Sequence, residues 1–104
     1  MIPQDYTVID LEMTGLHPKN DAILEVGAAK IRNGEVTDTM DIFVNPGRKI
    51  TQEITELTGI TDEMVKEGLS PAAAFHKTAE FIGDDILAGH NIIFDYSFLA
   101  AGSQ

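Results

Sequence analysis

The N-terminal part of the chain carries its hydrophobic side chains in the short runs and alternations that are typical of β-strands. Residues 6–11 (YTVIDL) are rich in β-branched and aromatic residues. A second run covers residues 22–32 and leads into Asn33-Gly34, a strong signal for a hairpin turn. Residues 35–44 return from that turn, and the apolar residues Val36, Met40, Ile42 and Val44 all stand at even positions, as one face of a strand requires. The pattern therefore predicts three antiparallel strands.

The second half of the chain changes to the spacing of apolar residues that is typical of helices. Three helices are predicted between residues that start or stop helices: residues 51–57 before Gly59, a short segment from Thr61, and the run between Ser70-Pro71 and Gly83. A short apolar strand at residues 86–88 follows, and a last helix is expected from about Phe94. This order predicts an α/β protein with a mixed sheet and helices packed on it, in a single domain over residues 1–104.

Composition narrows the class of protein. Hydrophobic residues make up 43% of the chain and charged residues 23%, an ordinary balance for a globular domain. The absence of cysteine excludes a disulfide framework, a thiolate zinc site and a cysteine nucleophile. No apolar stretch approaches the roughly 20 residues of a membrane helix, and the N-terminus lacks the features of a signal peptide. We therefore expect a cytoplasmic domain that does not enter a membrane.

The net charge of −10 constrains the partners of the protein. A protein that binds nucleic acid by electrostatics alone needs a basic face to displace the counterions of the phosphates. The charge balance argues against such a protein. It leaves open a protein that meets phosphate through bound divalent cations, because these cations invert the local charge.

Three carboxylates stand in positions that suggest chemistry. Asp10 and Glu12 are two residues apart at the end of the first strand, so both side chains leave the same face. A divalent cation would relieve their mutual repulsion, and oxygen ligands suit Mg²⁺ or Mn²⁺. Asp95 follows the 86–88 strand and would face both across a cleft if that strand lies beside the first one. The alternative is a frayed strand end with solvated acids, and an Asp95 that only complements its helix dipole.

At these residues the sequence resembles the DEDD-type 3′–5′ exonucleases, a family that includes the proofreading subunit and domains of bacterial DNA polymerase III and oligoribonuclease. Residues 8–16 (VIDLEMTGL) resemble the first motif of that family, and residues 90–95 (HNIIFD) resemble the second. Residues 23–29 and 58–61 also fit, so the resemblance covers essentially the whole chain. It implies a ribonuclease-H-like fold and hydrolysis of terminal phosphodiesters in replication proofreading or repair. DNA is favoured over RNA, although the first motif is also close to that of oligoribonuclease.

The resemblance also implies roles for individual residues. Asp10 would bridge two Mg²⁺ or Mn²⁺ ions, and Glu12 and Asp95 would complete their ligation. The single-stranded 3′ end would be bound by the backbone around Met13 and Thr14 and by the side chains of Leu16, Asn91 and Phe94. Ordinary packing of Leu16 and Phe94 and capping of the last helix by Asn91 are the alternatives.

Other polar residues carry weaker signals. Glu25 is interpreted as a solvated strand position rather than a helper of the metal site. The histidines His17 and His76 are expected on the surface, and His90 is expected to orient its turn. Asp84 and Asp85 are interpreted as loop charges. None of these residues is predicted to be a ligand or a catalytic group.

The sequence departs from the family pattern near its end. The third motif of the family supplies a general-base His or Tyr and a fourth Asp, and no such pair follows Tyr96. The resemblance therefore implies the N-terminal two-thirds of the fold, without its last strand and helix, and weak or absent activity for this chain alone. It also leaves the 86–88 strand as an exposed sheet edge, through which a homo-oligomer could form. A DNA polymerase is a further expected partner.

Two rival functions remain at this point. Asp10-x-Glu12-x-Thr14 after an apolar strand also resembles the nucleophile motif of HAD-type phosphatases, which usually begin a parallel βαβ fold. The Asn33-Gly34 hairpin disfavours that interpretation. The second rival is a non-catalytic domain that binds nucleic-acid ends, a polymerase or itself.

Overall fold

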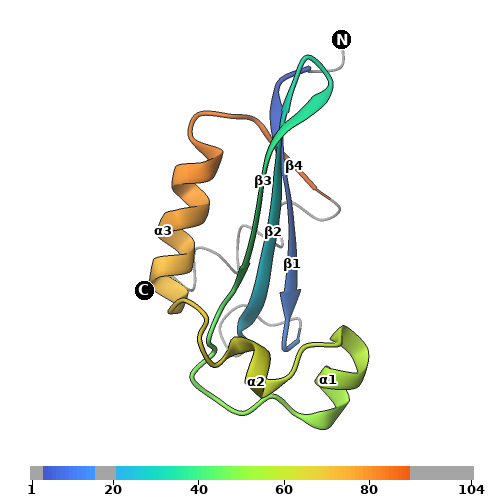
Figure 1. Cartoon of the computed structure of the whole chain (residues 1–104), viewed down its shortest axis with the longest axis vertical. Helices are drawn as coiled ribbons and strands as arrows, with labels where there is room; N and C mark the ends of the chain where they lie inside the picture. Colours follow the sequence, from blue (N-terminus) through green and yellow to red (C-terminus); the bar gives the residue numbers. More distant parts are fainter. Residues whose placement is uncertain (1–3, 16–20, 90–104) are drawn as a thin grey trace.

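The computed structural model describes residues 4–15 and 21–89, and the elements follow the predicted order (Figure 1). They are β1 (Tyr6–Met13), β2 (Ile23–Arg32), β3 (Glu35–Phe43), α1 (Gln52–Thr58), α2 (Asp62–Val65), α3 (Pro71–Ile82) and β4 (Leu87–Ala88). The helix predicted from Phe94 lies outside the described residues.

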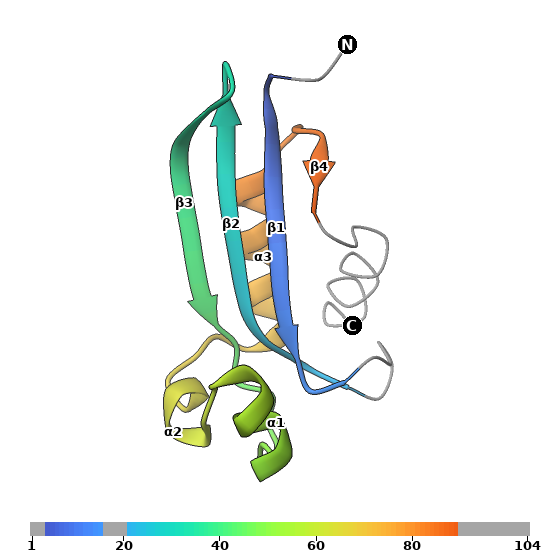
Figure 2. The same ribbon diagram turned by 90° about the vertical axis from the view of Figure 1, so that its right-hand side faces the viewer.

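The strands form one mixed sheet in the order β3-β2-β1-β4 (Figure 2). β1 pairs with β2, and β2 pairs with β3, in antiparallel fashion, which confirms the three predicted N-terminal strands. Asn33 and Gly34 both have positive φ, at 54° and 77°, as a two-residue hairpin turn requires. β4 lies parallel to β1, with Thr7 opposite Leu87 and Val8 opposite Ala88. The predicted placement of the 86–88 strand beside the first strand is therefore confirmed.

Two details of the strands differ from the predictions. β1 extends to Met13, because Glu12 still pairs with Glu25 and the register shifts only after it. The predicted alternation of β3 is wrong at Val36, which is 62% exposed. A shift of the β2–β3 register between Lys30 and Ile31 separates Val36 from the rest of the strand and changes the face that its side chain meets.

The predicted helix boundaries are close to the observed ones. Ser70 caps α3 by accepting a hydrogen bond from the Ala73 N–H at 3.1 Å, with Pro71 at the first helical position. Gly59 and Gly83, with φ of 78° and 57°, end α1 and α3.

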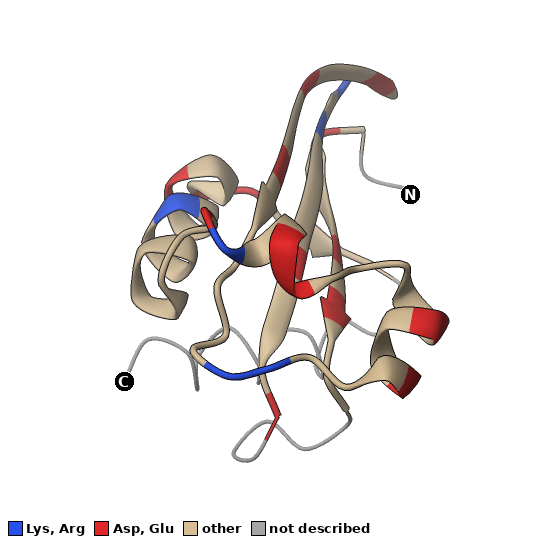
Figure 3. Ribbon diagram, turned by 60° about the horizontal axis from the view of Figure 1, so that its bottom comes forward, with Lys and Arg blue, Asp and Glu red and all other residues tan. Residues whose placement is uncertain are grey.

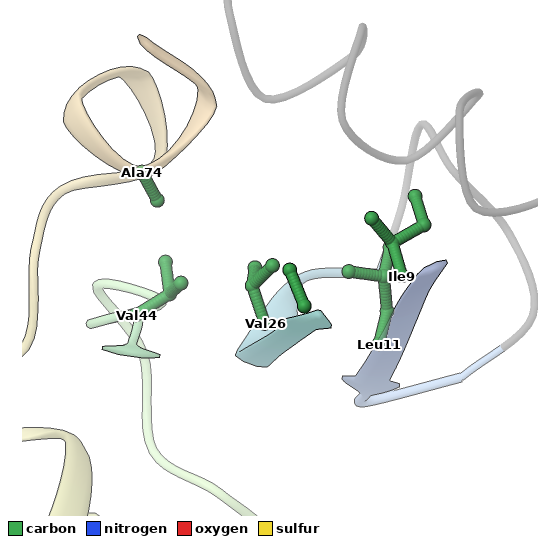
Figure 4. Close-up of a cluster of buried hydrophobic side chains, with 6 residues drawn as sticks. Ile9, Leu11, Val26, Val44 and Ala74 are labelled. Atoms are coloured by element: carbon green, nitrogen blue, oxygen red, sulfur yellow. The ribbon is translucent and has the colours of Figure 1, made fainter. Parts of the chain in front are cut away.

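The core lies between α3 and one face of the sheet (Figure 4). Its buried members alternate along the strands and meet one side chain of α3: Ile9, Leu11, Val26, Ala28, Val44 and Ala74. A second buried cluster of Leu24, Ile50, Ile60 and Val65 holds the α1–α2 segment against the end of the sheet. Because neighbouring side chains in a strand point to opposite faces, the residues between the core positions lie on the face that α3 does not cover.

Candidate active site

Asp10 and Glu12 lie on the face of the sheet opposite α3. Their neighbours Ile9 and Leu11 are buried in the core, while Asp10 is exposed and Glu12 is half-buried. Both carboxylates therefore leave one face of β1, as their spacing predicted. They line an open cavity of about 370 Å³, whose floor includes Gly27 of β2.

Two further carboxylates, Glu25 of β2 and Asp41 of β3, line the same cavity. Glu25 stands directly opposite Glu12 in the β1–β2 ladder, and a side-chain hydrogen bond joins it to Asp41. That bond, burial, and the charges of Asp41, Glu12 and Asp10 raise the pKa of Glu25 to about 7. The interpretation of Glu25 as a solvated strand position is therefore wrong, since it is half-buried among three other acids.

Gly27 lies in the middle of the four carboxylates and has no side chain to fill the cavity between them. In the sheet it lies between Asp10 on β1 and Asp41 on β3. A methyl group at Gly27 would make only an ordinary contact with the Asp10 carbonyl oxygen, at 3.8 Å, so alanine would fit at this position. A larger side chain there would occupy the cavity itself. The glycine thus keeps open the space into which the acids project.

The placement of Glu25 and Asp41 in the cavity could be predicted only in part from the sequence. Glu25 alternates with buried Leu24 and Val26, so its face could have been assigned from the pattern. Its position opposite Glu12 depends on the register across the β1–β2 loop. Asp41 depends on the register of the second hairpin, which contains the shift, and no motif marks it.

Thr14 is held at the neck of the loop that follows β1. Its N–H donates to the Ala22 carbonyl at 2.8 Å, and its hydroxyl donates to Asp21 at 3.1 Å and accepts from the Ala22 N–H at 2.9 Å. Met13 precedes it, half-buried at the end of β1. The expected contact with a terminal nucleotide would therefore use atoms of Thr14 other than this N–H.

The remaining predicted site residues, Leu16, Asn91, Phe94 and Asp95, lie outside the described residues, as do His17 and His90. The structure does show the direction of β4, the strand that precedes the second motif in the sequence. β4 runs parallel to β1, so the chain leaves β4 toward the end of the sheet that carries Asp10 and Glu12 (Figure 2). His76 is exposed on α3, as expected.

Asp85 lies in the loop between α3 and β4, as expected, and there it fixes the approach to β4. Its carboxylate accepts hydrogen bonds from the buried Thr7 hydroxyl at 2.6 Å and from Arg32 at 2.8 Å, with the Lys30 ammonium 3.7 Å away. The hydrogen bond from Thr7 and the two cations hold the pKa of Asp85 below its usual value. The neighbouring Thr7 N–H donates to the Ile86 carbonyl at 2.9 Å. These bonds join β4 to β1 and β2.

The donor set on β1 fits a hard divalent cation. Asp10 and Glu12 offer only oxygen ligands, and the surrounding carboxylates make the cavity strongly negative. Within residues 4–15 and 21–89, no group of three or more His, Cys, Asp or Glu side chains is arranged to hold a metal ion. A complete site therefore needs ligands beyond those of the described strands, which is where Asp95 was predicted to act.

Acidic residues lie on α1 and α2 at the lower end of the molecule, with basic segments of the chain beside them (Figure 3). Glu53, Asp62 and Glu63 occupy the first turns of these helices. No helix in the described part of the chain is long and apolar enough to cross a membrane.

The fold agrees with the comparisons to known proteins. The profile of the exonuclease family (RNase T) matches residues 7–103, and the chain belongs to that family. Among solved structures, exonuclease I superposes with a TM-score of 0.78 over 92% of this chain and 23% of its own, at 18% identity. Exonuclease I of E. coli in complex with a dA16 oligonucleotide gives a TM-score of 0.78 over 93% of this chain. The predicted ribonuclease-H-like exonuclease fold is thus confirmed.

The curated relatives are DNA polymerases of the "DNA polymerase III PolC-type". That of Latilactobacillus sakei is 44% identical over 96% of this chain, and that of Bacillus subtilis is 43% identical over 92%. The matched region spans only 7% of the length of each relative. The HAD-type alternative does not fit, because β2 follows β1 in antiparallel pairing with no helix between them.

Proposed function

We propose that the chain is a metal-dependent 3′–5′ exonuclease domain that removes terminal nucleotides from single-stranded DNA in replication proofreading or repair. The observation that carries this proposal is the projection of Asp10 and Glu12 from one face of β1 into an open acidic cavity of an exonuclease fold. The polymerase relatives favour DNA over RNA and a polymerase as a partner. A role beside a polymerase would place the chain in the cytoplasm.

Asp10, Glu12 and Asp95 would hold the metal in this proposal. Two Mg²⁺ or Mn²⁺ ions, when bound, would supply an activated water and stabilise the leaving 3′ oxygen. The protein would orient the last nucleotide through the backbone near Met13 and Thr14. Leu16, Asn91 and Phe94 would shape the pocket for its base and sugar.

We further propose that this 104-residue chain, by itself, turns over slowly. No His or Tyr with a suitably spaced Asp follows Tyr96 to activate water. Loss of a general base typically costs about 10²–10⁴ in rate. A turnover equal to that of an exonuclease with all three motifs would contradict this.

The test is digestion of a single-stranded DNA oligonucleotide labelled at its 5′ end, with Mg²⁺ or Mn²⁺ present. We expect stepwise shortening from the 3′ end that Asp10→Ala abolishes. Glu53→Ala, which removes an exposed acid of α1, should leave it unchanged. An RNA of the same sequence tests the preference for DNA. Equal shortening by the Asp10→Ala variant would contradict the proposed site.

The alternative is a domain that binds nucleic-acid ends without hydrolysing them. In this alternative the carboxylates of β1 would hold a cation and a nucleotide end without activating a water. Binding of Mn²⁺ and a nucleoside monophosphate, with no shortening of the oligonucleotide after long incubation, would support this alternative over the enzyme.

Self-association through β4 is proposed as a separate property. β4 is at one edge of the described sheet, and Ile86 before it is 61% exposed. An apolar sheet edge invites pairing with another chain. Light scattering that shows only monomers at high protein concentration would contradict it.

A further inference from the structure

The opposite edge of the sheet, formed by β3, has the features of a binding surface. β3 is the terminal strand on that side (Figure 2). Of the described residues outside β2, Leu69 is the one that pairs with it, at its very end. The Leu69 N–H donates to the Phe43 carbonyl at 3.0 Å, and its carbonyl accepts from the Asn45 N–H at 2.8 Å. The edge thus accepts an extended parallel segment, and this pairing stops where Ser70 caps α3.

The hydrogen-bond pattern shows which backbone groups of β3 face outward. The Val44 N–H donates to the Leu24 carbonyl of β2 at 2.9 Å, whereas Phe43 points its carbonyl away from β2. Because these directions alternate along an antiparallel ladder, Asp41 and Thr39 also point outward. The Thr39 N–H donates to the carboxylate of Asp38 at 2.9 Å. The N–H groups of Asp41 and Phe43 point outward along the same edge on which Leu69 pairs, so a strand added there could bond to them.

A groove follows this edge between β3 and α3. It consists of two adjoining cavities of about 410 and 260 Å³, which share Ile42 and Lys77. Their apolar lining comes from Met40, Ile42, Phe43, Met64, Leu69 and Phe81. Asp38, Glu67 and Glu80 supply acidic side chains to this lining, against the single cation of Lys77. Asp41 also lines it from β3, with its carboxylate hydrogen-bonded to Glu25 on the other face of the sheet. The groove therefore combines an apolar floor with a net negative rim.

We propose that the β3 edge and this groove bind an extended segment of a partner protein in which basic and apolar side chains alternate. Such a segment would pair with Asp41 and Phe43 through its backbone. Every second side chain would enter the apolar floor, and the basic side chains between them would point to the opposite face of the sheet, toward the carboxylate of Asp41. The negative rim disfavours nucleic acid, whose phosphates it would repel.

A second copy of this chain is a poorer occupant of the same edge. Antiparallel pairing of two β3 strands would bring their acids, Glu35, Asp38 and Asp41, close to the same acids of the partner copy. Like charges on paired strands are destabilising, and charged edge strands commonly oppose self-pairing. These same acids would attract the positive side chains of a basic peptide.

The test uses the ¹⁵N-labelled chain and a blocked peptide of alternating lysine and valine. We expect the exchange protection of the Asp41 and Phe43 amides to rise about tenfold or more, while the amides of Met40 and Ile42, which face β2, stay unchanged. Only an added strand produces this alternation. A peptide of alternating lysine and proline carries the same charge, but it lacks the N–H at every second residue and favours the polyproline II conformation over a strand, so it should protect these amides much less.

Charge reversal gives the matched variants. Glu67→Lys combined with Glu80→Lys removes acids of the groove and should weaken peptide binding about tenfold or more. Glu53→Lys combined with Asp84→Lys makes the same change of net charge at exposed positions outside the groove and should leave affinity within about threefold. Equal losses in both variants, equal protection by the proline peptide, or protection of the β3 amides by self-association without peptide would overturn the proposal.

Discussion

The two faces of the central sheet are made by the same strands and have opposite properties. On one face, Ile9, Leu11, Val26 and Ala28 are buried in the core cluster that also contains Ala74 of α3. On the other, Asp10, Glu12, Glu25 and Asp41 project into an open cavity. Adjacent residues of a strand therefore have different roles in this domain: one packs in the core and stabilises the fold, and the next lines the candidate site. Substitutions at adjacent positions should have different consequences.

The largest difference is expected between Ile9→Ala and Asp10→Ala. Ile9 is 1% exposed, so its truncation leaves a cavity in the core and should lower the free energy of unfolding by about 2–5 kcal/mol. Asp10→Ala removes one of four crowded carboxylates and should change it by less than about 0.5 kcal/mol. Chemical denaturation measures both. Equal losses for the two variants would show that the two faces are not separated in this way.

A smaller effect is expected from Glu25→Gln in metal-free buffer. The raised pKa of Glu25, about 7 against 4.5, means that its contribution to stability is full below pH 4.5 and is lost as pH rises to about 7. Gln keeps a hydrogen-bonding group but has no charge to lose. The variant should therefore gain about 1 kcal/mol over the native chain between these pH values, a figure reduced for solvent screening. Parallel pH profiles of the two proteins would contradict the raised pKa.

The third effect concerns Asp85, whose pKa is lowered by Thr7, Arg32 and Lys30. For a lowered pKa the contribution to stability is present above pH 3.8 and is lost as pH falls through the folded-state value. Asp85→Asn should therefore be less stable than the native chain at neutral pH, and the gap should close in acid. Asp84→Asn, at an exposed neighbour without these bonds in the described structure, is the control. A gap that does not narrow as pH falls below 3.8 would contradict this account.

The sequence predicted most of the fold because local signals marked it. The Asn33-Gly34 turn, the Ser70-Pro71 cap and the alternation of apolar residues each depend on neighbouring positions. It also predicted that Asp10 and Glu12 share a face. The environment of Glu25, the presence of Asp41 and the anchoring of β4 by Asp85 depend on strand register and on contacts between distant residues. The Thr7–Asp85 hydrogen bond joins positions 78 residues apart, which no local pattern reports.

The central claim is that the open face of the sheet is a divalent-cation site of an exonuclease. Its most direct test is calorimetric titration of Mn²⁺ into the native chain, Asp10→Ala, Glu12→Ala and the control Glu53→Ala. The account predicts saturable binding by the native chain and the control, weakened about tenfold or more by either β1 substitution. No Mn²⁺ binding by the native chain, or binding that Asp10→Ala and Glu12→Ala leave unchanged, would contradict it.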